Sequence, residues 1–274
     1  MYPYLFESWI GDSVLIPTYG LALALAFTLG YLEAIRQTLL HQEDPKPLEG
    51  LFACVLLGMV VGSRLFHVVF EDWFYYFKHP ADIFSLWQGG FTLYGGIAGG
   101  TVAAVLYCRR KGLPTLRILD RFAPALLLGI AVGRLGCFAA GCCWGKPTSL
   151  PWAVSYLHRH SLTPVRDVPV HPVQLYEVFL TGLLFWVVQR YARQSPRQGN
   201  VFAVALVGYA VVRFFTEFFR GDKLRGTFPA TSLSTSQGLS ILLVLAVLTA
   251  LMRKGQLRDL FSGLRHALRP RTNG

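Results

Sequence analysis

Long apolar stretches recur along the chain, separated by short polar segments. Each stretch is about 20 residues long, which is the length that a helix needs to cross the hydrocarbon core of a membrane. Within them, apolar residues follow one another without the alternation that is typical of a membrane β-strand. We therefore predict seven transmembrane helices, at 17–36, 50–70, 90–108, 118–140, 172–191, 199–219 and 238–252. The first stretch has no basic leader and no cleavage site of small residues, so we expect it to remain in the protein.

Two of the polar segments, 71–89 and 141–171, are longer than the others and lie on the same predicted side of the membrane. They are rich in Trp, Tyr, Pro and His, and we expect them to form a small head or arms above the bundle. Their aromatic residues also fit a belt at the membrane interface. Hydrophobic residues make up 53% of the 274-residue chain, as in an integral membrane protein. The predicted fold class is an all-α polytopic membrane protein, a bundle of about seven transmembrane helices with a small periplasmic head, in a single domain over residues 1–274.

The basic residues are distributed unevenly between the two sets of loops. Of the 26 Lys and Arg residues, 15 fall on the side that holds the C-terminal tail and 7 on the other side. Since cytoplasmic loops carry the excess of basic residues, we predict a periplasmic N-terminus and a cytoplasmic C-terminus. The net charge of +11 comes from these loops and from a tail in which Leu and Phe separate the charges, which favours contact with anionic membrane lipids. No nucleic-acid recognition module accompanies the charge, so we expect no nucleic-acid partner.

Charged residues inside the predicted spans need a partner or a polar cavity, because each costs about 2.5 to 3.5 kcal/mol near the bilayer centre. Arg64, in VVGSRLFHVVF, follows Gly58 and Gly62 at a spacing that lets another helix approach closely. It fits either a ligand for a lipid headgroup or one member of a structural ion pair. Arg213 and Glu217, in VVRFFTEFFRGD, are one helical turn apart. They form either an isolated salt bridge or a pair in which Arg213 binds an anionic substrate, phosphate above all, while Glu217 holds its guanidinium group in place.

Glycines surround a single tyrosine in the third span, in GGFTLYGGIAGG. They permit a closely packed or irregular backbone, which is tolerated at membrane depth only against protein or a water-filled cavity. A buried tyrosine usually finds a hydrogen-bond partner, so packing alone does not define the role of Tyr94.

One arginine and three cysteines lie close together at the end of the fourth span, in GRLGCFAAGCCWGKPT. On a helix, Arg134, Cys137 and Gly141 share one face, and the glycines beside them leave room for a ligand or another helix. Cys137 could form a disulfide with Cys142 or Cys143 on the outer side of the membrane. The C-x4-C-C spacing is not a usual zinc pattern and no pair of histidines accompanies it, so we expect no metal and no other cofactor. The third interpretation is that these thiols are small apolar fillers.

Seven segments of the chain follow one another in the order IPTYGL, VVGSRLFHVVF, WQGGFTLYGG, DRFAPALLLGIAVGRLGCFAAGCCWGKPT, HPVQLYE, RFFTEFFRGD and STSQGLS. In these segments, and so over nearly its whole length, the chain resembles bacterial prolipoprotein diacylglyceryl transferases. The resemblance implies a seven-helix bundle of the bacterial cytoplasmic (inner) membrane, with a periplasmic head and a central cavity open to lipid. It also implies transfer of the diacylglyceryl group of phosphatidylglycerol to the lipobox cysteine of a prolipoprotein, with release of glycerol phosphate.

The resemblance further implies roles for four residues. Arg134 and Arg213 match the two essential arginines of the family and would hold the phosphate group. Glu217 matches the carboxylate that positions Arg213, and Tyr19 matches a tyrosine that contacts the lipid headgroup. The implied partners are phosphatidylglycerol, the prolipoprotein signal peptide with its lipobox, and the surrounding membrane lipids.

The chain departs from the family pattern at four positions. Tyr94 stands where the family has a histidine suited to deprotonating a thiol, and a tyrosine is a poor base toward a thiol. In the fourth span, Cys137 and Ala140 replace two asparagines, and Cys142 replaces a glutamate. We predict Cys142 to be the functional thiol, with its pKa lowered by the charge of Arg134.

Three functions are compatible with these departures. The first is the family reaction, with another group or water removing the proton. The second is a phospholipid-using transferase that serves another acceptor through a catalytic cysteine, either Cys137 or Cys142. The third is a lipid-binding or redox-sensing membrane protein that is not an enzyme.

Overall fold

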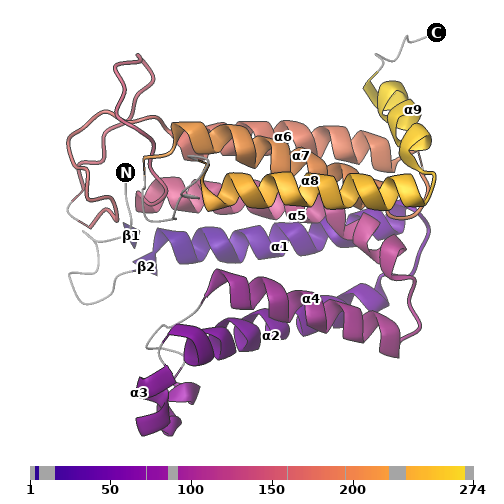
Figure 1. Cartoon of the computed structure of the whole chain (residues 1–274), viewed down its shortest axis with the longest axis horizontal. Coiled ribbons are helices and arrows are strands. Elements are labelled where there is room, and N and C mark those ends of the chain that lie inside the picture. The colour runs from indigo at the N-terminus through magenta and orange to yellow at the C-terminus, as the bar shows by residue number, and fades with distance from the viewer. Residues whose placement is uncertain are drawn as a thin grey trace. The chain divides into compact units, whose positions relative to one another are not determined.

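The computed structural model describes residues 4–5, 16–71, 73–85, 92–158, 160–194, 196–221 and 233–268, and the structural statements below concern these residues (Figure 1). The elements follow one another as β1 (Tyr4–Leu5), β2 (Ile16–Pro17), α1 (Thr18–Leu40), α2 (Lys46–Phe66), η1 (His67–Glu71), α3 (Trp73–Lys78), η2 (Pro80–Phe84), α4 (Leu93–Arg110), α5 (Thr115–Ala140), α6 (Val173–Ala192), α7 (Asn200–Thr216), η4 (Glu217–Phe219), α8 (Thr235–Arg253) and α9 (Leu257–Leu268). The two short strands pair in antiparallel orientation, with Tyr4 opposite Pro17.

A long helix lies at each of the seven predicted spans, and the all-α polytopic fold class is confirmed. Within the described ranges, five helical stretches are long and apolar enough to cross a membrane: Thr18–Leu40, Lys46–Phe70, Thr115–Ala140, Asn200–Phe219 and Thr235–Arg253. α4 and α6 do not reach this level of apolarity. The reason is their composition, because α4 contains four glycines and ends on two arginines, while α6 carries a glutamate and two glutamines.

The chain divides into two compact units, which we describe separately. Residues 1–34 and 119–274 form unit 1, and residues 35–118 form unit 2. The single domain expected over residues 1–274 stays a prediction.

Unit 1 is a helical bundle in which α7 packs against both α6 and α8 (Figure 1). The N-terminal part of α1 lies against α5, and small residues make this approach close. A side chain at Gly30 would lie 3.3 Å from the backbone oxygen of Ala125, and one at Gly136 would lie 2.6 Å from the Cβ of Ala22. The bundle therefore contains α5 close to α1, with the C-terminal end of α5 beside the first turn of α1.

A buried apolar cluster secures one end of unit 1. Tyr191 and Val188 of α6, Val201 of α7, Leu251 of α8 and Leu260 of α9 are all buried in it. α9 packs across the end of α6 (Figure 1), and the backbone oxygen of its penultimate residue accepts a 2.9 Å hydrogen bond from the Nε of Arg190.

The other end of unit 1 carries the segment between α5 and α6. This segment has no long helix and is held by short backbone pairings, such as Gly145 with Arg220 and Pro147 with Val170. The backbone nitrogen of Lys146 donates to the oxygen of Phe219 at 2.8 Å, and that of His171 donates to the oxygen of Lys146 at 3.0 Å. These pairings fix the end of α5, the beginning of α6 and the end of α7 relative to one another.

Unit 2 is built on the close packing of α2 against α4. A Cβ atom at Gly99 would lie 2.1 Å from the backbone oxygen of Gly58, and one at Gly62 would lie 2.5 Å from that of Gly95. The predicted role of the small residues is confirmed, because only hydrogen side chains leave room for the two backbones. Thr92 caps α4 by accepting a hydrogen bond from the backbone nitrogen of Gly95 at 3.3 Å.

Candidate functional site

A buried carboxylate lies at the centre of a cluster of charged groups in unit 1. Glu177, in the second turn of α6, is only 1% exposed. Its Oε2 forms an ion pair with the Nε of Arg134 from α5, and its Oε1 lies 2.5 Å from the Nη1 of Arg213 from α7. Thr216 donates a hydrogen bond to the same Oε1 at 3.2 Å. Glu177 thus joins the two arginines that the sequence singled out.

A second carboxylate supports the arginine from α7. The Nη2 of Arg213 lies 2.6 Å from the Oε2 of Glu217, which confirms the predicted pair one helical turn apart. Glu217 belongs to the tighter turn η4 that follows α7. Arg220, at the end of that turn, lies with its Nε 3.8 Å from Glu217 and its Nη1 4.0 Å from Glu177.

The cluster has more positive than negative groups among the described residues. Three guanidinium groups, of Arg134, Arg213 and Arg220, face the two carboxylates of Glu177 and Glu217. The three guanidinium groups therefore outnumber the two carboxylates in a buried region, where charge is costly. Such a cluster suits an anionic ligand, because a guanidinium group can donate to two oxygens of a phosphate group at once.

The backbone at the end of α5 brings a loop back over this cluster. The nitrogen of Gly141 donates to the oxygen of Phe138 at 3.3 Å and that of Cys142 to the oxygen of Cys137 at 3.2 Å, which together form a Schellman motif. Gly141 has a φ of 76°, as this motif requires, and a Cβ atom there would lie 2.1 Å from the Oγ of Ser161. Gly141 ends the helix as expected, whereas its role in substrate binding stays a prediction.

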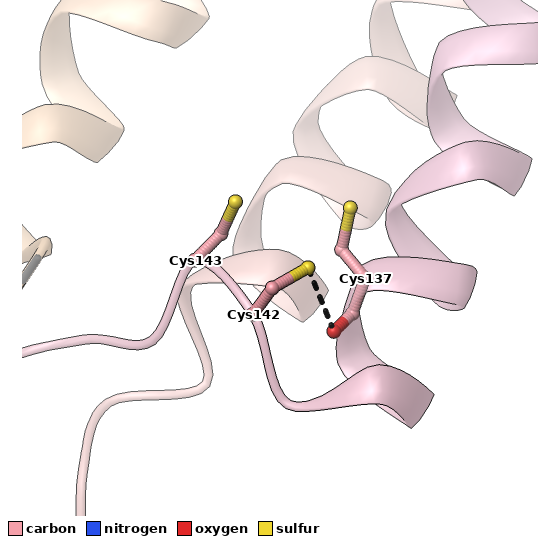
Figure 2. Close-up of side chains that lie close together, drawn as sticks. All are labelled: Cys137, Cys142 and Cys143. Atoms are coloured by element: carbon pink, nitrogen blue, oxygen red, sulfur yellow. Dashed lines mark hydrogen bonds between the residues drawn. The ribbon is translucent and has the colours of Figure 1, made fainter. Parts of the chain in front are cut away.

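Three thiols converge at this turn. The sulfur atoms of Cys137, Cys142 and Cys143 all lie within 4.8 Å of one another, and Figure 2 shows the Cys142 side chain between the other two. The Cys142 thiol donates to the backbone oxygen of Cys137 at 3.6 Å, while the Cys143 sulfur accepts a hydrogen bond from the Nη1 of Arg134 at 3.8 Å. Cys137 and Cys142 are free thiols in the described part of the structure.

The thiol that Arg134 contacts is that of Cys143. Hydrogen bonds from Cys137 and Cys142, together with the charge of Arg220, lower the pKa of Cys143 below its ordinary range. The hydrogen bonds of Cys142 to its two neighbours, together with burial, raise the pKa of Cys142. The structure therefore differs from the expectation that Arg134 lowers the pKa of Cys142, because the loop turns Cys143 toward the guanidinium group. Cys142 as the functional thiol stays a prediction.

A glutamine from α6 fixes the loop that carries these thiols. The Nε2 of Gln174 donates to the backbone oxygen of Cys142 at 2.6 Å and to the hydroxyl of Tyr156 at 2.9 Å. Burial raises the pKa of Tyr156 to about 12, so its hydroxyl stays neutral. Gln174 lies one turn before Glu177, so one face of α6 holds both the thiol loop and the arginines.

The remaining predicted site residues are distributed over both units. Tyr19, at the beginning of α1 in unit 1, is 42% exposed and lies against Gly136 of α5. Tyr94 lies in α4 of unit 2, and its side chain is outside the described part of the structure.

Arg64 lies in unit 2 and is buried. Its guanidinium group donates to the backbone oxygens of Asp82 at 2.6 Å, Ile83 at 3.0 Å and Ser85 at 3.3 Å, and lies over the ring of Tyr76 at 5.2 Å. These contacts hold the guanidinium group within unit 2. Both interpretations of Arg64, as a ligand for a lipid headgroup and as one member of a structural ion pair, stay predictions.

Three residues of the cluster were not predicted from the sequence. Glu177 and Gln174 lie in HPVQLYE, which served only as a segment that matches the family, and Arg220 lies among the loop residues that were counted for the charge. A carboxylate inside a predicted span was the available signal for Glu177, since such a group needs a partner. No local pattern indicates that Gln174 would bind the thiol loop.

Comparisons with known proteins show the family of the chain. The prolipoprotein diacylglyceryl transferase family matches residues 8–253. A phosphatidylglycerol–prolipoprotein diacylglyceryl transferase of Bordetella avium (strain 197N) is 39% identical over 242 residues, which cover 85% of this chain and 89% of the relative. The enzyme of the same name from Legionella pneumophila (strain Corby) is 37% identical over 86% of this chain and 88% of the relative. That from Aromatoleum aromaticum (strain DSM 19018 / LMG 30748 / EbN1) is 40% identical over 81% of this chain and 85% of the relative. The chain belongs to the prolipoprotein diacylglyceryl transferase family.

Proposed function

We propose that the protein transfers the diacylglyceryl group of phosphatidylglycerol to the thiol of a prolipoprotein lipobox cysteine. The observation that carries this proposal is the buried cluster in which three arginines face two glutamates. Phosphatidylglycerol has a negatively charged phosphodiester, which guanidinium groups bind through two oxygens at once. The names of the relatives give the same substrate pair.

Arg134 and Arg213 hold the phosphodiester, and the two glutamates hold the arginines. Arg134 contacts one carboxylate through its Nε, and Arg213 contacts a carboxylate with each of its two terminal nitrogens. These contacts fix the orientation of both guanidinium groups, whose remaining N–H groups bind the lipid. Because the groups are buried, their attraction for a phosphate is less screened than in water. The same contacts stabilise the leaving glycerol phosphate, on which negative charge develops.

The reaction is a displacement at carbon. The acceptor thiol loses its proton, and its sulfur attacks the glycerol carbon that bears the phosphate ester. The bond between that carbon and the ester oxygen breaks, and its electron pair leaves with glycerol phosphate while a thioether forms. The thiolate is the nucleophile, so the site must keep water away and supply a route for the proton.

The protein lies in the bacterial inner membrane, with the segment between α5 and α6 on the periplasmic side and the C-terminus in the cytoplasm. This orientation rests on the 15 basic residues that fall on the side of the tail. It places the arginine cluster near the outer leaflet, where a prolipoprotein arrives after export. α9 would then lie at the inner surface, where its exposed arginines face anionic lipids.

Purified protein in detergent, phosphatidylglycerol labelled in its acyl chains and a lipobox peptide test this proposal by mass spectrometry. We expect a peptide that gains the mass of one diacylglyceryl group, with one glycerol phosphate released per event. The matched control is the same peptide with the lipobox cysteine replaced by serine, which should gain nothing. An unmodified cysteine peptide after long incubation, with protein that remains folded, would refute the proposal.

A further inference from the structure

The three thiols at the end of α5 have the spacing of metal ligands. A cation such as Zn²⁺ binds thiolate sulfur at about 2.3 Å, so two sulfurs of a tetrahedral site are separated by about 3.8 Å. The sulfurs of Cys137, Cys142 and Cys143 are within 4.8 Å of one another before any ligand is added. Figure 2 shows the three side chains gathered at the turn that ends the helix.

The backbone is shaped to produce this convergence. The Schellman motif at Gly141 turns the chain back so that Cys142 lies beside Cys137 of the preceding turn. Cys143 then adopts a φ of 60°, which is uncommon for a residue with a side chain and points to a constraint at that position. From the sequence alone we expect no metal, because C-x4-C-C differs from the usual zinc patterns. Because α5 ends between Cys137 and Cys142, the three sulfur atoms converge although their spacing in the sequence is unusual for a metal site.

The surrounding charges favour a thiolate-rich metal site. Three thiolates and one divalent cation have a net charge of −1, and Arg134 already donates to the Cys143 sulfur at 3.8 Å. Arg220 also interacts with that sulfur. Hydrogen bonds from such groups to ligating sulfurs orient the ligands and stabilise the anionic complex.

We propose that Cys137, Cys142 and Cys143 bind one thiophilic divalent cation, with Zn²⁺ as the best chemical fit, and that its open fourth position takes the acceptor thiol. Zn²⁺ sites with three protein ligands keep a position for water or substrate, whereas structural sites use four. This inference deepens the proposed function and rests on it. It accounts for Tyr94, since a thiol bound to the cation is deprotonated without a histidine base.

The step balances without an oxidant or a reductant. The acceptor thiol displaces a water molecule from the cation and releases its proton to solvent. Its sulfur then attacks the glycerol carbon, and the electron pair of the broken carbon–oxygen bond leaves with glycerol phosphate. The thioether that forms is a weaker ligand than a thiolate and dissociates, and the cation keeps its three cysteine ligands.

Cobalt(II) is the probe for the site, because its absorption reports both geometry and sulfur ligation. Reduced, chelator-treated protein in detergent is titrated with Co²⁺ and then with Zn²⁺. We expect one tetrahedral Co²⁺ per chain, with sulfur-to-cobalt charge-transfer absorption that Zn²⁺ abolishes. Addition of the lipobox peptide should raise this absorption by about one third, as three thiolates become four. The serine peptide should leave it unchanged.

Variants separate this site from the other cysteines. Cys142→Ser and Cys143→Ser should each lose the tetrahedral spectrum, whereas a Cys54→Ser, Cys108→Ser double variant should keep it, because those two residues lie in α2 and α4. If a site variant fails to fold, wild-type protein whose thiols are blocked with a maleimide serves instead and should also bind no cobalt.

The outcomes test the metal site and the proposed function separately. Absence of a tetrahedral spectrum in wild-type protein, or a spectrum that the cysteine peptide leaves unchanged, overturns the inference. Full turnover in chelator-treated protein also overturns it, and leaves the proposed function standing. A cobalt site that binds the cysteine peptide in a protein that never turns over phosphatidylglycerol supports the metal site and overturns the proposed function.

Discussion

Replacement of Glu177 by glutamine removes the central negative charge with almost no change in shape. The side chain is 1% exposed and contacts Arg134, Arg213 and Thr216, so no water replaces the lost charge. Breaking a buried ion pair by removing one partner typically costs about 3 to 5 kcal/mol. We expect Glu177→Gln to lower the free energy of unfolding by about that amount and to abolish turnover, because the arginines lose the group that orients them.

Chemical denaturation in detergent, followed by circular dichroism, measures this loss. The matched control is Glu49→Gln, the same chemical change at an exposed position in the first turn of α2, which should cost about 0.3 to 1 kcal/mol. A Glu177→Gln protein that unfolds within about 1 kcal/mol of wild type and still modifies the lipobox peptide would show that Glu177 does not organise the arginines.

Three further predictions test the site. Arg134→Lys and Arg213→Lys should each reduce turnover by about 100-fold although the charge is kept, because an ammonium group lacks the planar fork; near-normal rates in either would contradict the phosphate assignment. Gly141→Ala should lower the free energy of unfolding by about 1 to 2 kcal/mol through its φ of 76°, whereas Gly133→Ala, on the same helix with no atom within 4 Å of the new Cβ, should be neutral or stabilising by up to about 1 kcal/mol. In reduced, metal-free protein Cys143 should be alkylated below the pH of about 8.5 at which an ordinary thiol ionises, because a lowered pKa keeps the reactive thiolate as the pH falls; a rate that rises only above that pH would refute the pKa direction.

The helices could be predicted from the sequence because membrane spans have a strong and local signal. About 20 consecutive apolar residues indicate a span without knowledge of its neighbours, and all seven predicted positions hold a long helix. The close approach of α2 and α4 was predictable for the same reason, since Gly58 and Gly62 follow one another at one helical turn.

The site was predictable only where its geometry is local. Arg213 and Glu217 are four residues apart, so their contact follows from the helix alone. Glu177 meets Arg134 across 43 residues of chain, and this contact depends on how α5 and α6 pack. Which of Cys142 and Cys143 contacts Arg134 depends on the backbone angles after the end of α5. The φ of 60° at Cys143 has no sequence signature.

The position of α9 has a consequence for the order in which unit 1 is completed during synthesis. Tyr191 of α6 is fully buried, and a side chain at Gly263 of α9 would lie 2.6 Å from its ring. Because the ribosome produces α6 about 70 residues before α9 emerges, the cluster around Tyr191 stays uncovered while α7 and α8 enter the membrane. The nascent protein therefore exposes the side of the Tyr191 ring that faces Gly263 until α9 is synthesised and covers it.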